Sequence, residues 1–202
     1  MSKGIIALDA DGVLLDYSLA YASAWERAFG VYPQEKDLDA YWPIDRWRVD
    51  RVTGERLERF RAAFDETFWA SVPAIDGAVQ ACHELRRHGY DLVCVTAVAQ
   101  KFLKARQQNL RTLGFPLTAV YATEHREGER SPKADVLQEL RPAAFVDDYL
   151  PYLAGVHQDI HAALIVRGRN GAPNADNPVR SPDSRHSDLA AFSQWWLERH
   201  AG

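Results

Sequence analysis

The sequence predicts an α/β protein with a parallel five-stranded sheet, helices on both faces of that sheet and an inserted all-helical segment. Three observations lead to this fold class. Five short apolar runs show no clean alternation of apolar and polar residues, which is typical of strands buried on both faces. Helical patterns lie between these runs, as repeated βαβ units require. One long segment after the first run has helical periodicity but no strand candidate.

The predicted strands are rich in β-branched residues or close on a polar residue. They cover residues 5–9, 92–96, 119–122, 144–147 and 163–166. The helices between them are opened by Pro or Asp-Gly and stopped by Gly. They cover about residues 76–88, 102–113 and 132–140, and a final helix covers 187–199. Residues 168–182 are rich in Gly, Pro, Asn and Asp, which predicts a long loop before that final helix.

Residues 17–72 break the alternation of strands and helices. Their apolar and aromatic residues follow helical spacing and predict two amphipathic helices. The first is marked by Ala20, Tyr21, Ala24, Trp25, Ala28 and Phe29, and the second by Leu57, Phe60, Phe64 and Phe68. We therefore expect two units: an α/β core formed by residues 1–16 and 73–202, and a helical cap insertion formed by residues 17–72.

The composition is that of an ordinary globular protein. The chain has 202 residues, of which 47% are hydrophobic and 26% charged, and this excludes a disordered chain, a collagen-like repeat and a coiled coil. A chain of this length buries enough surface to fold without disulfides or a structural metal, so we expect Cys82 and Cys94 to be buried free thiols. The net charge of −4 provides no strong basic field for a nucleic-acid polymer.

We expect a soluble, cytoplasmic protein. The first apolar run, Gly4 to Leu8, is shorter than the roughly 7–15 residues of a signal-peptide core. No apolar run approaches the ~18 residues that a membrane span requires.

The first predicted strand leads directly into DADGVLLD, residues 9–16. In an open α/β sheet, ligands bind beyond the carboxyl ends of the strands, which is where Asp9 and Asp11 stand. Gly12 permits the sharp turn that brings both carboxylates to one pocket. Two carboxylates this close repel each other unless a cation neutralises them. A hard divalent ion with oxygen ligands, Mg²⁺ before any other, is the natural partner.

Further polar residues are expected at the same edge of the predicted sheet. Thr96 closes the second strand, Asp147 and Asp148 close the fourth, and Lys133 begins the helix before that fourth strand. Carboxylates, a metal, a hydroxyl and a lysine together suit a phosphoryl group. One carboxylate attacks, the cations offset charge on the phosphoryl oxygens, and another carboxyl handles the leaving-group proton.

These elements, in this order, resemble the haloacid dehalogenase superfamily of phosphohydrolases. DADGV is similar to the first motif of that family, VTA around Thr96 to the second, SPK at Lys133 to the third and VDD to the fourth. The resemblance covers the chain apart from the C-terminal loop and final helix. It implies a Rossmann-like core, and residues 17–72 stand where the family's helical cap of the first type is inserted.

The resemblance also implies roles for single residues. Asp9 is expected to be the nucleophile that forms an aspartyl-phosphate, and Asp11 the general acid and then base, whose backbone carbonyl binds Mg²⁺. Thr96 would hold phosphoryl oxygens, and Lys133 would bridge nucleophile and phosphate. Asp148 is preferred as the metal ligand, with Asp147 the alternative. The choice stays open because the further acidic residue of many members is missing from residues 149–152.

The expected activity is Mg²⁺-dependent hydrolysis of a small phosphorylated metabolite. A phosphomutase with the same residues is one alternative, and a non-catalytic binding protein that keeps the fold is another. Dehalogenation is disfavoured because that branch lacks the second aspartate, which is present here as Asp11. The sequence does not name the substrate or the oligomeric state.

Some tryptophans and one arginine are candidates for contact with the substrate. Trp42 and Trp47 lie in an irregular stretch and are the better candidates among the tryptophans, whereas Trp25 and Trp69 are expected in the core. Arg167 follows the fifth strand, where a solvated loop is the favoured interpretation and contact with an anionic substrate the alternative.

Overall fold

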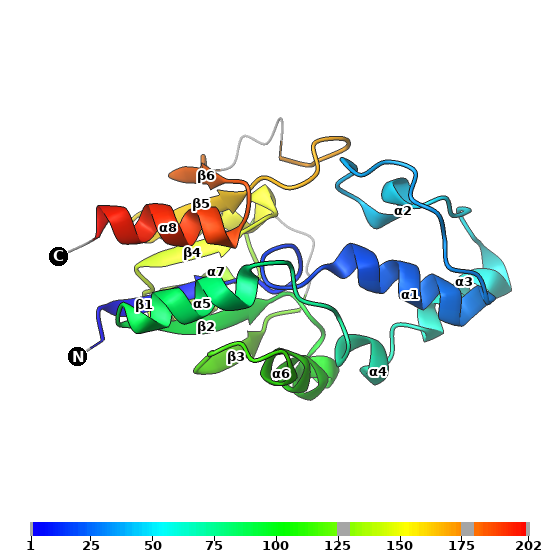
Figure 1. Cartoon of the computed structure of the whole chain (residues 1–202), viewed down its shortest axis with the longest axis horizontal. Coiled ribbons are helices and arrows are strands. Elements are labelled where there is room, and N and C mark those ends of the chain that lie inside the picture. The colour runs from blue at the N-terminus through cyan, green and yellow to red at the C-terminus, as the bar shows by residue number, and fades with distance from the viewer. Residues whose placement is uncertain (1, 125–129, 175–179, 201–202) are drawn as a thin grey trace.

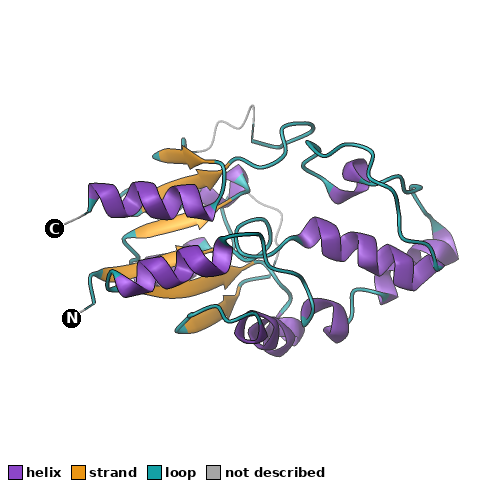
Figure 2. Ribbon diagram, viewed as in Figure 1, coloured by secondary structure: helices purple, strands orange, loops and turns teal. Residues whose placement is uncertain are grey.

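The computed structural model describes residues 2–124, 130–174 and 180–200, and its centre is a six-stranded parallel sheet. The strand order is β3-β2-β1-β4-β5-β6, and every neighbouring pair runs parallel. Figures 1 and 2 show the sheet at one end of the molecule and a helical segment at the other. The strands are β1 (Gly4–Leu8), β2 (Tyr90–Thr96), β3 (Ala119–Ala122), β4 (Ala144–Asp147), β5 (His161–Ile165) and β6 (Ser184–His186).

The prediction of five strands was one strand short. β6 has only three residues, none of them apolar, and it pairs with β5 at the edge of the sheet. A short polar edge strand carries no apolar run that could distinguish it from a loop. It lies just beyond the segment predicted as a long loop, whose residues 175–179 are outside the described residues.

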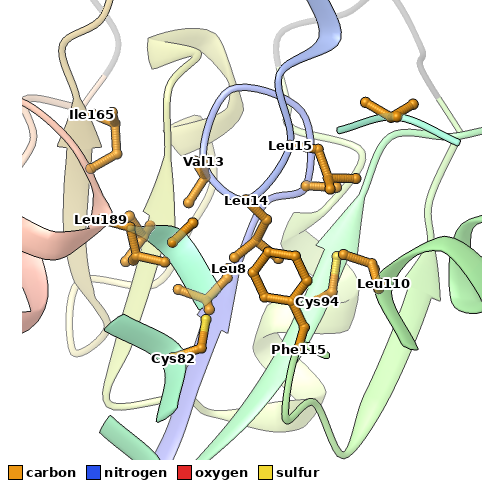
Figure 3. Close-up of a cluster of buried hydrophobic side chains, with 14 of the residues drawn as sticks. Leu8, Val13, Leu14, Leu15, Cys82, Cys94, Leu110, Phe115, Ile165 and Leu189 are labelled. Carbon is orange, nitrogen blue, oxygen red and sulfur yellow. The ribbon is translucent and has the colours of Figure 1, made fainter. Parts of the chain in front are cut away.

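Helices cover both faces of the sheet. Side chains alternate along β1, so Ile6 and Leu8 pack on one face and Ala7 on the other. The first face packs against α5, α6 and α8, and Figure 3 shows Leu8, Cys94, Leu110 and Phe115 within this cluster. The second face packs against α7 and η2. These helices are α5 (Ala78–Arg87), η1 (Gln100–Phe102), α6 (Leu103–Thr112), α7 (Ala134–Leu140), η2 (Leu150–Leu153) and α8 (Leu189–Arg199).

One expectation about the core is met on these faces. Cys82 and Cys94 are buried free thiols, as predicted. Among the helices of the described ranges, none has the length and apolar character needed to cross a bilayer.

The segment between β1 and α5 is helical, and the described part of it contributes no strand to the sheet. Its second predicted helix is divided in two, because the chain leaves helical geometry after Ala62 and starts again with Asp65 as N-cap. The Asp65 carboxylate accepts a hydrogen bond from Phe68 N at 2.9 Å and pairs with Arg27 at 2.6 Å. The four helices are α1 (Tyr17–Phe29), α2 (Pro43–Arg46), α3 (Gly54–Ala62) and α4 (Glu66–Trp69).

The strand order places β1 at a topological switch point. From β1 the chain builds β2 and β3 on one side and then crosses to β4 on the other. In open α/β sheets the crevice beyond the carboxyl ends of such strands is the usual ligand site. The residues that follow β1 and β4 therefore face a common crevice, and the helical segment leaves the core at the same edge (Figure 1).

A pair of histidines ties β6 to the sheet. His161 Nε2 and His186 Nε2 both lie 2.8 Å from Ser184 Oγ, so the hydroxyl can donate to one neutral ring and accept from the other. Burial lowers the pKa of both histidines; nearby Asp183 opposes this at His161. The folded state therefore favours the neutral rings.

We expect this histidine pair to make stability fall as the pH falls below about 6.5, since the unfolded chain then binds more protons. The free energy of unfolding, measured with urea at pH 7.5 and 5.5, should decline less in His186→Gln than in the wild type. His157→Gln, which changes an exposed histidine, is the matched control. Equal declines in all three proteins would show that the histidine pair does not cause the loss of stability.

Candidate active site

The loop after β1 is a tight turn that presents two carboxylates. Leu14 N and Leu15 N both donate to Ala10 O, and Gly12 N donates to Leu15 O at 2.8 Å. Gly12 has φ of +93°, and a Cβ there would lie 2.3 Å from Asp148 Oδ2. Both the backbone angle and the lack of space therefore require glycine.

Lys133 is the centre of the site. It precedes α7 and is completely buried, and its Nζ lies 2.6 Å from Asp9 Oδ1 and 2.7 Å from Asp147 Oδ2. Burial lowers the pKa of the ammonium, but the carboxylates of Asp147 and Asp9 together outweigh this and raise it. Lys133 is thus a fixed cation that joins the ends of β1 and β4.

The two aspartates at the end of β4 have different surroundings. Asp147 uses both oxygens, because Oδ2 accepts from Lys133 and Oδ1 accepts from Tyr149 N at 2.9 Å. Asp148 Oδ2 accepts from Arg167 Nε at 2.6 Å, and the Asp148 carboxylate also faces the pocket. Burial raises the pKa of both carboxyls, opposed by Lys133 at Asp147 and by Arg167 at Asp148.

Asp11 faces a different cation. Both of its carboxylate oxygens lie 2.8 Å from Arg106 Nη2, which comes from α6. Burial raises the pKa of Asp11, and the Arg106 guanidinium opposes that rise. The sequence predicts no partner for the Asp11 side chain, so this ion pair is a finding of the structure.

Three carboxylates are close enough to share one cation. Asp9, Asp147 and Asp148 each offer an oxygen, and these three oxygens lie within 4.8 Å of one another. All three side chains are buried, and among the residues that the structure describes only Lys133 and Arg167 form ion pairs with them. Counted as carboxylates, the three groups carry one more negative charge than the two cations offset. Carboxylate oxygens are the donors that hard divalent ions prefer. The group therefore fits a divalent metal ion such as Mg²⁺.

A pocket of about 370 Å³ opens over these residues, and aromatic rings form much of its wall. Trp42 is 42% exposed, and its ring lies against Tyr41 and Tyr149. On the polar side stand Asp9, Asp11, Asp148 and Arg167. The full lining is Asp9, Asp11, Tyr17, Tyr41, Trp42, Pro43, Trp69, Ala97, Asp148, Tyr149, Tyr152 and Arg167.

The structure brings most of the predicted site residues together. Asp9, Lys133 and Asp147 form one connected set of ion pairs, and Asp148 belongs to the same carboxylate group. Thr96 ends β2 beside β1 and is buried, and the next residue, Ala97, lines the pocket. The Asp11 carboxylate lies outside the three-carboxylate group, and it is the Asp11 backbone carbonyl that the resemblance assigned to the metal.

One expectation about the tryptophans was wrong. Trp47 is only 3% exposed, and its indole nitrogen donates to Ser18 O at 2.9 Å, so it belongs to the interior rather than to a substrate surface. Trp69 was expected in the core, and its partly buried ring does pack against the core while it also lines the pocket. Trp42 lines the pocket as predicted. The irregular sequence around Trp47 did not indicate that its indole would reach Ser18 on α1.

Arg167 and Arg106 were missed as site residues. Arg167 was interpreted as part of a solvated loop, but its guanidinium pairs with Asp148 and lies 4.8 Å from the centre of the Tyr41 ring. Arg106 did leave a signal, because it stands with Leu110 on the apolar face of its helix. A charged residue on such a face needs a buried partner.

A family model identifies the family of the chain, and solved structures resemble its fold. A family model for "5' nucleotidase, deoxy (Pyrimidine), cytosolic type C protein" (NT5C) matches residues 3–123, more than half of the chain. A search of curated proteins finds no match.

Solved structures resemble the whole chain at low sequence identity, so they speak for the fold. L-2-haloacid dehalogenase from Xanthobacter autotrophicus, with chloropropionic acid covalently bound, has a TM-score of 0.63 at 15% identity and covers 100% of both chains. A HAD family hydrolase from Deinococcus radiodurans, with bound phosphate and sodium, has a TM-score of 0.61 at 16% identity, covering 96% of this chain and 95% of that one.

A third structure is a phosphatase solved with its metal. D,D-heptose 1,7-bisphosphate phosphatase from B. bronchiseptica, complexed with magnesium and phosphate, has a TM-score of 0.56 at 17% identity and covers 98% of this chain and 99% of that one. These likenesses establish the α/β fold that the motifs predicted. The chain therefore belongs to the 5' nucleotidase, deoxy (pyrimidine), cytosolic type C family of phosphatases, and its fold is that of the haloacid dehalogenase-like hydrolases.

Proposed function

We propose that this chain is a Mg²⁺-dependent 5'-nucleotidase that hydrolyses the phosphomonoester of a nucleoside monophosphate through an aspartyl-phosphate on Asp9. The observation that carries the proposal is the buried group of Asp9, Lys133, Asp147 and Asp148 at the base of an aromatic-walled pocket. The name of the matching family supports the nucleotide as substrate.

Asp9 is the proposed nucleophile. Its carboxylate lines the pocket, and Lys133 holds Oδ1 at 2.6 Å, which fixes the side chain and leaves Oδ2 for attack on phosphorus. The ammonium also offsets the negative charge that builds on the phosphoryl oxygens. Thr96 is proposed to hold those oxygens through its hydroxyl.

Asp11 is proposed to handle the proton. It would protonate the ester oxygen as the nucleoside leaves, and then accept a proton from the water that hydrolyses the aspartyl-phosphate. Its carboxylate lines the same pocket as Asp9 and is partly exposed, so a leaving group can reach it.

The residues that would hold Mg²⁺ are the carboxylates of Asp9 and Asp148 and the backbone carbonyl of Asp11. Asp148 is preferred over Asp147 because Asp148 lines the pocket, whereas both oxygens of Asp147 are engaged by Lys133 and Tyr149 N. When bound there, the ion supplies positive charge that stabilises the transferring phosphoryl group.

The substrate's base is proposed to lie against the aromatic wall. Trp42, Tyr149 and Tyr41 contact one another there, and a planar base gains stacking energy on such rings. We propose that the helical segment of residues 17–72 acts as a cap over the site, because it supplies Tyr17, Tyr41, Trp42 and Trp69 to the lining.

We expect phosphate release to require Mg²⁺. Chelation with EDTA should abolish the release of phosphate from nucleoside 5'-monophosphates, and added Mg²⁺ should restore it. Ca²⁺ should restore little, because it is larger and takes a looser, higher coordination than in-line phosphoryl transfer needs. Full activity in excess EDTA would contradict the metal assignment, and activity confined to phosphosugars would contradict the nucleotide.

A further inference from the structure

Arg106 is a completely buried cation that the proposed chemistry does not use. It lies on α6, and its exposed surface is 0%. Asp11 is its ion-pair partner, with Nη2 at 2.8 Å from both carboxylate oxygens. A buried guanidinium is costly to desolvate, and leucine would fill the same apolar face without that cost. The position of Arg106 therefore needs an explanation beyond packing.

We propose that Arg106 is a positioning residue that holds the Asp11 carboxylate in the orientation from which it serves the leaving group. This inference rests on the proposed function, in which Asp11 carries the proton. Each carboxylate oxygen offers about two lone-pair sites, and a single guanidinium nitrogen engages one site on each. The contact fixes the plane of the carboxylate while leaving a site free on each oxygen for a proton.

The rest of the guanidinium is directed at no competing acceptor. Nε and Nη1 are buried and have no hydrogen-bond partner among residues 2–124, 130–174 and 180–200. The contact with Asp11 thus provides the only side-chain hydrogen bonds of Arg106 within that part of the chain. An arginine with a structural role in a helix packing site would be expected to satisfy these groups with backbone carbonyls.

Arg106 is itself held by the wall of the pocket. Its guanidinium carbon lies 5.0 Å from the centre of the Trp69 ring, and that ring lines the pocket. One turn further along α6, Asn109 Nδ2 donates to Ala70 O at 3.2 Å and to Val72 O at 3.0 Å. α6 therefore binds the chain where the helical segment returns to the core, and it also carries the arginine that contacts Asp11.

The test compares two esters in the intact, Mg²⁺-loaded protein. A nucleoside 5'-monophosphate has an alkoxide leaving group that needs a proton, whereas p-nitrophenyl phosphate has one that needs little. Arg106→Met should lower kcat for the nucleotide on the order of 10- to 100-fold, the cost of a misplaced catalytic group, with KM nearly unchanged. The initial burst of nitrophenol should fall much less. Arg106→Lys keeps the charge and should recover part of the loss.

A double-mutant cycle decides whether Arg106 acts through Asp11. Asp11→Asn should lower kcat for the nucleotide by roughly 10²–10⁴-fold. Adding Arg106→Met to it should change kcat by no more than about twofold, because the group to be positioned is already gone. Losses that multiply in the double variant, or equal losses for both esters in Arg106→Met, would overturn the proposal.

Controls separate this proposal from the proposed function. Arg111→Met changes an exposed arginine of the same helix and should leave both kcat values unchanged. Thermal melting reports whether each variant folds, and if Arg106→Met does not, the cycle is measured with Arg106→Lys. A wild-type protein that releases no phosphate overturns both proposals. An active wild type with a multiplicative cycle overturns only the role of Arg106.

Discussion

Replacing Asp9 by asparagine is expected to abolish turnover while leaving the fold intact. The amide is nearly isosteric with the carboxylate, but it cannot attack phosphorus and carries no charge to hold a cation. The amide oxygen can still accept the hydrogen bond from Lys133, and Asp147 remains 2.7 Å from that ammonium. The buried cation therefore keeps a counter-ion, and we expect thermal stability close to that of the wild type.

The measurement is phosphate release from a nucleoside 5'-monophosphate in the presence of Mg²⁺, with thermal melting of the same samples. Asp159→Asn is the matched control, because its side chain is 82% exposed and remote in sequence from the motifs. We expect wild-type rates from the control and no product from Asp9→Asn. Hydrolysis by Asp9→Asn near the wild-type rate would rule out the covalent mechanism.

The sheet could be predicted from the sequence where strands are buried on both faces. Residues 92–95 and 144–146 are apolar throughout, and parallel pairing in the centre of a sheet produces that pattern. β6 could not be predicted, because its three residues, Ser184, Arg185 and His186, are polar and form no apolar run. Its pairing depends on contacts with β5 that are distant in sequence.

Helix boundaries in the inserted segment were less predictable than helix content. The spacing of Phe60, Phe64 and Phe68 is that of one continuous helix, and the three rings do pack against one another. The break at Asp65 arises because its carboxylate caps α4 and pairs with Arg27 from α1. A side chain that can cap a new helix competes with the helix already formed.

The site could be predicted where each residue directly follows a strand or begins a helix. Asp9 follows β1, whereas Asp147 ends β4 and Asp148 follows it, so the topology alone brings the three to one edge. Arg106 and Arg167 could not be assigned in this way, because their roles depend on which carboxylate each guanidinium reaches. Long side chains of this kind connect elements that are far apart in the sequence, and residue spacing does not show which of these elements will be in contact.

Replacing Lys133 should lower both stability and activity, because its ammonium joins the carboxylates at the ends of β1 and β4. Its side chain is completely buried between Asp9 and Asp147, and its ammonium lies 4.6 Å from the centre of the Tyr152 ring. Lys133→Met would leave two carboxylates buried without their shared cation. Breaking a buried pair in this way typically costs about 3–5 kcal/mol of stability. We also expect kcat to fall by roughly 10²–10³-fold or more, since a charge that stabilises the phosphoryl oxygens is gone.

Urea unfolding in EDTA and in Mg²⁺ tests the cause of the instability. If the cost comes from uncompensated carboxylates, Mg²⁺ should restore part of the lost stability in Lys133→Met, because the ion binds the folded carboxylate group and not the unfolded chain. The gain from Mg²⁺ should be larger in this variant than in the wild type, whose carboxylates already have Lys133. Lys104→Met, which removes an exposed lysine of α6, should match the wild type in both buffers. A loss of stability that Mg²⁺ does not relieve would mean that Lys133 supports the packing around Phe145 and Tyr152 rather than the charge balance of the site.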